Sequence, residues 1–203
     1  MFSAFLDTCV LVPGTLRDLL LELGTTPAYR PLWSDRIEDE LKRVVQRRDG
    51  KVGRDPDETE AKITRLIRSM NRALPDARIV GWKYLVDGIE LKDQNDRHVV
   101  AAAIHGRADV IVTFNLRDFE CEVLPGQLLV QSPNEFLQDL LDLYPSLVFQ
   151  AVEAIVKRSG RKGPKWTEDT FLDCLERNKQ LKEFVDAYRE ERERRLTSQR
   201  YIK

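Results

Sequence analysis

An acidic side chain stands where an apolar helix is expected to begin. The segment 93–118 opens with carboxylates, continues as an apolar helix predicted over 96–105, and ends at Asp118. Asp96 falls on the same face as the apolar residues that follow it, although a helix normally keeps charge off its buried face. Two explanations are open at this point. Asp96 caps the helix through backbone N–H groups, or it belongs to a functional site.

Other acids follow predicted strands at their carboxyl ends. Asp7 comes after the apolar run 1–6, and Asp118 comes after the apolar strand 110–114. Functional sites of open parallel sheets form at this edge. Because the helix of a connection between parallel strands runs antiparallel to the strand that follows it, the helix begins at the edge where that strand ends. We therefore expect Asp7, Asp96 and Asp118 to lie on one rim of the sheet.

The predicted helix 35–48 offers a fourth acid. Glu38 and Glu40 flank its apolar face on opposite sides. Helical spacing does not choose between the two glutamates. The same spacing fits a pair of solvated charges that belong to no site.

Several carboxylates at one place favour a metal ion. They repel one another and raise each other's pKa values, and a divalent cation relieves that repulsion. Ligands that are all oxygen suit Mg²⁺ or Mn²⁺ rather than zinc, and His98 and His105 are the only histidines. Such an ion can activate water and stabilise charge on a phosphate. The pattern therefore indicates hydrolysis of phosphodiester bonds.

The order of predicted elements is that of an α/β protein. Strands are predicted over 1–6, 78–82, 110–114 and 127–130, a brief extended piece over 31–34, and helices over 16–23, 35–48, 58–74 and 96–105. A polar loop is expected over 49–58. Beyond about residue 134 only helical patterns appear, and the charged tail is expected to fray. We predict a central parallel sheet between two helical layers in residues 1–133 and an all-α extension in residues 134–203.

Composition narrows the class of protein. The chain has 203 residues, 42% hydrophobic and 33% charged, and no apolar run approaches the length that a membrane span needs. The N-terminus has no basic segment of the signal-peptide kind. Three widely spaced cysteines, Cys9, Cys121 and Cys174, predict reduced thiols in the cytoplasm.

Basic residues are concentrated in two segments although the net charge is −1. Residues 42–72 contain ten Lys or Arg and five Asp or Glu, and residues 157–165 contain five basic residues and no acid. A solvated surface explains either segment by itself. Together they permit contacts with phosphates.

Four motifs resemble the PIN domain, and among PIN domains the bacterial toxins of the VapC type. They are LDTCVLV at 6–12, DEL at 39–41, NDRHVVAAAIHGRADVIVTFNLRDF at 95–119 and SPNEFL at 132–137. The resemblance covers residues 1–137, and the segment 95–119 is its most specific part. It implies a parallel sheet flanked by helices and an endoribonuclease that depends on Mg²⁺ or Mn²⁺.

The resemblance also implies roles for single residues. The metal-binding and catalytic acids of the family match Asp7, Glu40 and Asp96, with Asp118 as the fourth, so that the family pattern selects Glu40 over Glu38. Thr113, Asn115 and Arg97 are then expected to contact the RNA or to support the metal ligands. A small antitoxin protein and a homodimer are implied as partners, and the helical region 134–203 resembles the extension of some longer members.

Two positions depart from the family pattern. Cys9 stands where the family often has Asn, which predicts that a polar contact is missing. Asn115 stands where the family often has Asp, which leaves the last acidic role to Asp118 or to neither residue. The alternative to a nuclease is therefore a non-catalytic PIN-like module that binds RNA or a protein.

Three other kinds of active site each lack a required residue or motif. A haloacid-dehalogenase-like phosphatase with Asp7 as nucleophile needs a second Asp at position 9, where this chain has Cys9. A nucleophilic Cys9 has no evident His partner, and a buried hydrophobic role is commoner for such a cysteine. No glycine-rich phosphate loop of the P-loop kind is present.

Overall fold

The computed structural model describes residues 2–91, 93–119, 124, 128–161 and 163–200. It divides into two compact units, Met1–Ser132 and Pro133–Lys203. Cys121 lies outside the described residues, whereas Cys9 and Cys174 are free thiols. No helix of the described part is long and apolar enough to span a membrane.

The first unit is built on a parallel sheet of five strands in the order β3-β2-β1-β4-β5. The strands are β1 (Ser3–Leu6), β2 (Arg30–Ser34), β3 (Arg78–Ile79), β4 (Val110–Val112) and β5 (Leu129–Gln131). The two central strands β1 and β4 are buried along their whole length, as expected for a sheet covered on both faces. They pair with Ala4 opposite Val110 and Leu6 opposite Val112. The strand order reverses at this pair, which is where sites form in open sheets.

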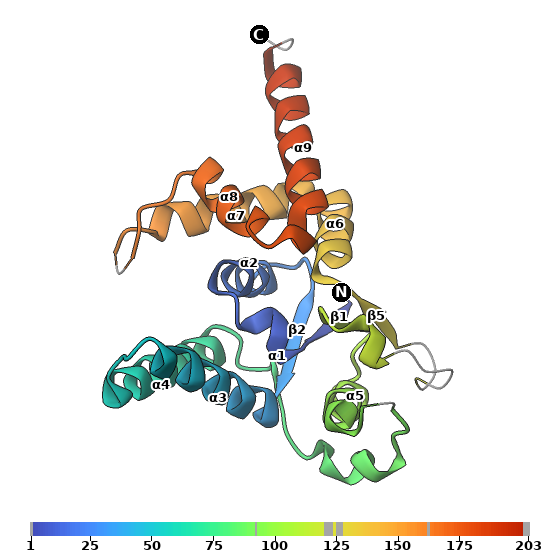
Figure 1. Cartoon of the computed structure of the whole chain (residues 1–203). Coiled ribbons are helices and arrows are strands. Elements are labelled where there is room, and N and C mark those ends of the chain that lie inside the picture. Colours follow the sequence, from blue (N-terminus) through green and yellow to red (C-terminus); the bar gives the residue numbers. More distant parts are fainter. Residues whose placement is uncertain (1, 92, 120–123, 125–127, 162, 201–203) are drawn as a thin grey trace. The chain divides into compact units, whose positions relative to one another are not determined.

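Helices cover both faces of this sheet. The α-helices are α1 (Thr8–Leu11), α2 (Gly14–Gly24), α3 (Asp35–Lys51), α4 (Pro56–Ala73) and α5 (Arg97–His105). Three short 3₁₀ helices are η1 (Trp82–Gly88), η2 (Gln94–Asp96) and η3 (Leu116–Phe119). Helices α2, α3 and α4 lie on one side of the sheet and α5 lies on the other (Figure 1). The predicted three-layer α/β/α fold is confirmed.

The polar loop predicted over 49–58 is much shorter in the structure. Helix α3 continues to Lys51, and α4 begins at Pro56, where Asp55 caps it by accepting N–H bonds from Asp57 and Glu58. Asp49 is buried near the end of α3 and pairs with cations on both sides of it in the sequence. These pairings keep the polar sequence helical.

Strand β3 is also shorter than predicted. It ends at Ile79, and Gly81 adopts a left-handed conformation with φ of 82°. Because glycine enters this region without a steric penalty, the chain turns there and continues as η1 from Trp82. The run predicted as one strand over 78–82 therefore contains a turn.

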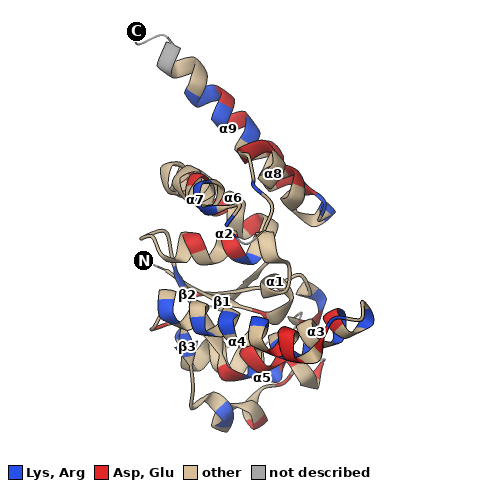
Figure 2. Cartoon of the chain, turned by 90° about the vertical axis from the view of Figure 1, so that its left-hand side faces the viewer, with Lys and Arg blue, Asp and Glu red and all other residues tan. Residues whose placement is uncertain are grey.

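The second unit is helical throughout its described part, which confirms the predicted all-α extension. It contains α6 (Pro133–Leu143), α7 (Pro145–Arg158), α8 (Glu168–Glu176), the 3₁₀ helix η4 (Lys179–Leu181) and α9 (Lys182–Arg200). Acidic and basic residues alternate along α9 (Figure 2). Arg189 pairs with Asp173 and Glu176 of α8, each at 2.8 Å. Helix α9 continues to Arg200, and these ion pairs with the buried Phe184 and Tyr188 hold its first half. Fraying of the charged tail stays a prediction.

Asn134 links the start of α6 to the start of α9. Its side-chain oxygen accepts the backbone N–H of Phe184 at 2.9 Å, and its nitrogen donates to Glu183 at 3.0 Å. We expect Asn134→Ala to lower the free energy of unfolding by about 2 kcal/mol, because it leaves a buried donor without a partner. Urea unfolding of the full chain measures the change. The exposed substitution Gln150→Ala is the control, and an equal effect of both would contradict this role.

Candidate metal centre

Asp7 is held by donors from two neighbouring strand ends. It is buried immediately after β1, and its Oδ1 accepts the backbone N–H of Thr8 at 2.6 Å. Its Oδ2 accepts the hydroxyl of Thr113, the residue after β4, at 2.7 Å. These bonds keep the carboxylate fixed at the edge where β1 and β4 end. Thr113 therefore supports a predicted metal ligand directly.

Cys9 supplies a polar contact that its sequence position seemed to lack. Its Sγ donates to Asp7 Oδ2 at 3.1 Å and accepts the backbone N–H of Phe114 at 3.2 Å. The prediction that a contact is missing at this position is wrong, because the thiol reaches the same carboxylate. Burial, followed by the charge of Asp7, raises the pKa of Cys9 to about 12. Cys9 thus remains a thiol and is not a nucleophile at neutral pH.

Asp96 lies among other acids and has no capping role. It ends η2 directly before α5, and its side chain makes no capping hydrogen bond. Asp93 is the residue that caps η2, through the N–H of Asn95. Burial raises the pKa of Asp96 to about 6, and the charges of Asp7, Asp93 and Asp118 add to the rise. The fold therefore places Asp7, Asp93 and Asp118 near enough to Asp96 for their charges to act on it, and the sequence analysis did not single out Asp93.

The turn after β4 places the remaining polar candidates. The backbone N–H of Asn115 donates to the hydroxyl of Thr113 at 3.0 Å, and that of Asp118 donates to the carbonyl of Asn115 at 3.0 Å. The side chain of Asp118 is half-buried, whereas Asn115 is exposed. Arg97 begins α5, and its Nε is buried without a hydrogen-bond partner among the described residues.

Glu38 belongs to the core of the domain. Its carboxylate is buried and accepts hydrogen bonds from Trp33 at 3.1 Å, Asn71 at 2.7 Å and Arg78 at 3.2 Å. These donors come from β2, α4 and β3, and they satisfy the charge locally. Glu38 therefore links the sheet to α4 and is not part of the acidic edge.

Glu40 lies on the opposite side of α3 from Glu38 and contacts residues close to Asp7 and Asp96. Its Oε2 accepts the hydroxyl of Thr8 at 2.7 Å, and its Oε1 lies 3.0 Å from His98 Nε2 and 3.2 Å from Arg36 Nε. Burial by itself raises the pKa of Glu40, but the hydrogen bond and charge of His98, with the bonds from Thr8 and Arg36, lower it to about 2. Glu40 is therefore ionised at neutral pH.

Thr8 and His98 were not identified from the sequence as site residues. Thr8 follows Asp7, and His98 lies two residues after Asp96, so that Glu40 is bound to close neighbours of both acids. His98 is buried, with its ring 6.0 Å from that of Trp82. A histidine close in sequence to a predicted ligand was the available signal.

The donors suit a hard divalent cation in their chemistry. Asp7, Glu40, Asp96 and Asp118 offer carboxylate oxygens only, and the pKa of Asp96 is raised by burial first and then by the charges of neighbouring acids. Within the described ranges, no group of three or more His, Cys, Asp or Glu side chains is already arranged to hold a metal ion. These four acids would hold an ion only after their side chains had moved.

Comparison with known proteins identifies the family of the first unit. Residues 3–117 match the model of the PIN domain family. The chain belongs to the PIN domain family. Residues 133–190 of this PIN protein match a second family, described as the VapC50 C-terminal domain. The PIN domain therefore occurs here together with the extension known from VapC50.

One curated relative is similar over part of its length. It is described as "Putative ribonuclease VapC50" from Mycobacterium tuberculosis, and it is 40% identical over 85 residues. The alignment covers 39% of this PIN protein and 47% of the relative, so that it spans about half of the relative's length. No solved structure matches the chain.

The two glutamates of α3 should respond in opposite ways to substitution. Glu38→Gln is expected to lower the free energy of unfolding by about 2 kcal/mol, because a buried charge that accepts three hydrogen bonds is lost. Glu40→Gln is expected to weaken Mn²⁺ binding at least about tenfold with a smaller loss of stability. Urea unfolding and titration calorimetry measure the two effects. The reverse pattern would contradict a structural role for Glu38 and a metal-binding role for Glu40.

The pKa of Asp96 predicts a pH dependence of the metal-free protein. The folded pKa is about 6 against an ordinary value of 3.8, so that the unfolded chain loses this proton first as the pH rises. The contribution of Asp96 to stability therefore falls between about pH 4 and pH 6, by about 1–2 kcal/mol after allowance for solvent exposure. Asp96→Asn should be more stable than the wild type at pH 7 in EDTA by this amount. Thermal unfolding across the pH range measures it.

Added Mg²⁺ or Mn²⁺ should reverse this order. Each ion should raise the melting temperature of the wild type and leave that of Asp96→Asn almost unchanged, because binding stabilises only the folded form that holds the ion. Equal shifts in both proteins would show that the cation does not bind at Asp96.

Proposed function

We propose that this protein is an endoribonuclease that depends on Mg²⁺ or Mn²⁺ and acts as the toxin of a toxin–antitoxin pair. The observation that carries the proposal is the environment of Asp96, where burial, followed by the charges of Asp7, Asp93 and Asp118, raises the pKa to about 6. Acids brought together from distant positions cost stability unless a cation neutralises them. The likeness to a protein described as a ribonuclease supports RNA as the substrate.

In this proposal Asp7, Glu40, Asp96 and Asp118 hold the cation, which when bound supplies an activated water and stabilises charge on the phosphate. Asp7 arrives already oriented by Thr113 and Cys9. Glu40 keeps its negative charge at all physiological pH values because its pKa is about 2. Asp96 is the ligand that must lose a proton near pH 6, so that affinity for the cation falls below that pH.

The remaining side chains act on the substrate. Arg97 lies directly after Asp96 and carries a positive charge toward which a phosphate is attracted, and Asn115 offers an exposed amide at the end of β4. A small antitoxin and a homodimer are proposed as partners from the VapC-type resemblance. The VapC50-like region 133–190 supports the same assignment.

A second function is favoured by a different observation. The described residues contain no preformed group of metal ligands, and Asn115 stands where the family often has an acid. A PIN-like module that binds RNA without cutting it fits both facts. Cleavage and binding must therefore be measured on the same proteins.

A cleavage assay on the full chain tests the proposal. Wild-type protein with Mg²⁺ or Mn²⁺ should cut an end-labelled single-stranded RNA, and EDTA should stop the reaction. Asp7→Asn and Asp96→Asn should each lower the rate by about 100-fold or more, because each removes a ligand charge. Gel electrophoresis of the products measures the rate.

Asp39→Asn is the matched control because Asp39 precedes Glu40 and its side chain is 64% exposed. Its rate should equal that of the wild type. Cleavage that persists in EDTA, or in both ligand variants, would refute the metal-dependent nuclease. RNA binding without any cleavage by the wild type, unchanged in Asp7→Asn and Asp96→Asn, would establish the binding module instead.

A further inference from the structure

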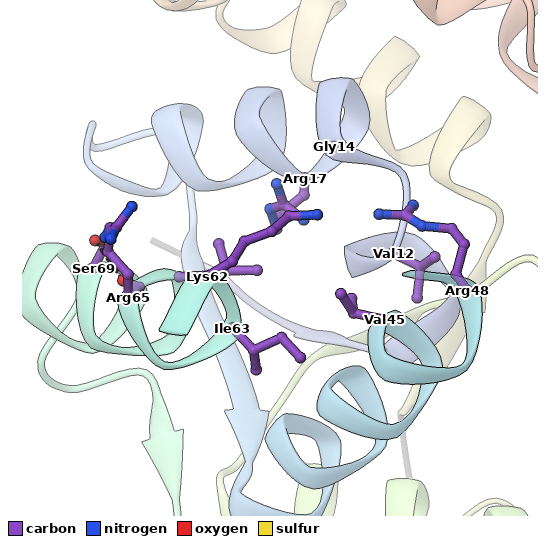
Figure 3. Close-up of a pocket in the computed structure, with 10 residues that line it drawn as sticks. Val12, Gly14, Arg17, Val45, Arg48, Lys62, Ile63, Arg65 and Ser69 are labelled. Atoms are coloured by element: carbon purple, nitrogen blue, oxygen red, sulfur yellow. Dashed lines mark hydrogen bonds between the residues drawn. The ribbon is translucent and has the colours of Figure 1, made fainter. Parts of the chain in front are cut away.

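A basic pocket lies in the first unit between the start of α2, α3 and α4 (Figure 3). Its volume is about 310 Å³. The basic pocket is the cavity lined by Val12, Gly14, Arg17, Val45, Arg48, Lys62, Ile63, Arg65, Leu66 and Ser69. None of these residues is among the carboxylates of the candidate metal centre.

The lining has an apolar part and a cationic part. Val12, Val45 and Ile63 form a floor, and the charged ends of Arg17, Lys62 and Arg48 gather above it (Figure 3). A ligand that fits this lining carries negative charge on one side and a flat or apolar group on the other. A nucleotide has both parts, a phosphate and a base.

Positive charge at the pocket is only partly neutralised. The buried Asp49 pairs with Lys62 at 2.9 Å, Arg54 at 3.1 Å and Arg48 at 3.6 Å, so that one carboxylate serves three cations. The hydrogen bond from Lys62 and then that from Arg54 lower the pKa of Asp49, which is therefore fully ionised. Arg65 adds a further positive charge, and among the described residues no ion pair joins it. The pocket therefore has an excess of positive charge for an anion.

Arg17 has an unused donor at the same place. Its Nη1 donates to the carbonyl of Leu11 at 3.2 Å, and its Nη2 lies 3.5 Å from Asp18. Its Nε is buried and has no partner among the described residues. The guanidinium is therefore only partly satisfied by protein acceptors, and its charged end lines the pocket (Figure 3).

Two helices connect the pocket to the candidate metal centre. Asp7 is the N-cap of α1 and Val12 is its C-cap, a separation of roughly 8 Å along the helix axis. On α3, Glu40 and Arg48 are eight residues apart, which corresponds to roughly 12 Å. At about 3.4 Å of rise per nucleotide, these separations equal about two to four nucleotides of a stacked strand.

We propose that the basic pocket binds one nucleotide of the RNA substrate, a few nucleotides from the bond that is cut. The phosphate contacts Arg17, Arg48 and Lys62, the base lies on the apolar floor, and Arg65 adds positive charge at the other end of the pocket (Figure 3). This inference rests on the proposed ribonuclease function and adds a substrate-binding site to it. The small volume favours a single nucleotide over a protein helix, whose apolar face needs a longer groove.

Two arginine pairs with the same charge change test the pocket. Arg48→Gln with Arg65→Gln removes one pocket cation from α3 and one from α4. Arg43→Gln with Arg72→Gln removes one exposed arginine from each of the same helices, outside the pocket. Fluorescence anisotropy with a labelled single-stranded RNA, in EDTA to prevent cleavage, measures the affinity of each full-length protein.

The pocket pair should bind RNA about tenfold more weakly than the wild type, and the slope of log affinity against log salt should fall by roughly 1. The control pair should stay within about twofold. Circular dichroism checks that each variant is folded. Arg65→Gln by itself, at an exposed position, should show part of the loss.

Other outcomes overturn the inference in distinguishable ways. Equal weakening by both pairs would mean that the RNA senses general surface charge. In a second outcome, the pocket pair binds RNA with wild-type affinity and still cuts it with Mg²⁺. That result would support the proposed ribonuclease function and refute the pocket as an RNA site. The pocket would then belong to another occupant, such as an acidic protein segment. A wild type that neither binds nor cuts RNA would refute the pocket and the proposed function together.

Discussion

Burial and mutual repulsion of carboxylates at one edge of the sheet are the constraint on which the candidate metal centre depends. The acids at this edge differ in the number of hydrogen bonds that they accept. Asp7 receives a backbone N–H, a hydroxyl and a thiol, and Glu40 receives a hydroxyl and the ring of His98. Asp96 makes no capping bond and has a raised pKa. The unrelieved part of the repulsion is therefore concentrated on Asp96, where a bound cation would gain the most.

The sheet topology makes this concentration unavoidable. Because β1 and β4 are neighbours and parallel, the residues that follow them must meet, and α5 begins at the same edge. Glu40 reaches the edge from the first turns of α3, whose start is set by the Ser34 cap. Glu38, two residues earlier, points to the opposite side of that helix and joins the core. Local helix geometry thus separates a structural acid from a candidate ligand.

Much of this arrangement was predictable from the sequence, and the rest was not, for physical reasons. Apolar runs predicted the parallel sheet, and strand ends predicted that Asp7 and Asp118 lie near Asp96, whose pKa their charges raise. A shared metal site stays a prediction. Spacing alone could not separate Glu38 from Glu40, since their difference lies in partners such as Asn71 and His98 from distant segments. The family resemblance was needed to select Glu40.

The contacts of Thr8, Cys9 and Asp49 were missed for the same reason. A hydroxyl or thiol beside an acid has no periodic signal, and its role becomes visible only when the other chain segment is in place. The helical ends around residues 49–58 were misjudged because Asp49 is buried and pairs with Arg48, Arg54 and Lys62, and this convergence has no signal in a polar sequence.

The central position of β1 has a consequence for synthesis of the protein on the ribosome. The first strand to emerge is completed on one side by β4, and Asp7 bonds to Thr113, which lies 106 residues later. Closing so long a loop is slow and must wait until the later segment has left the exit tunnel. A nascent chain therefore cannot assemble the acidic edge until most of the first unit has been translated.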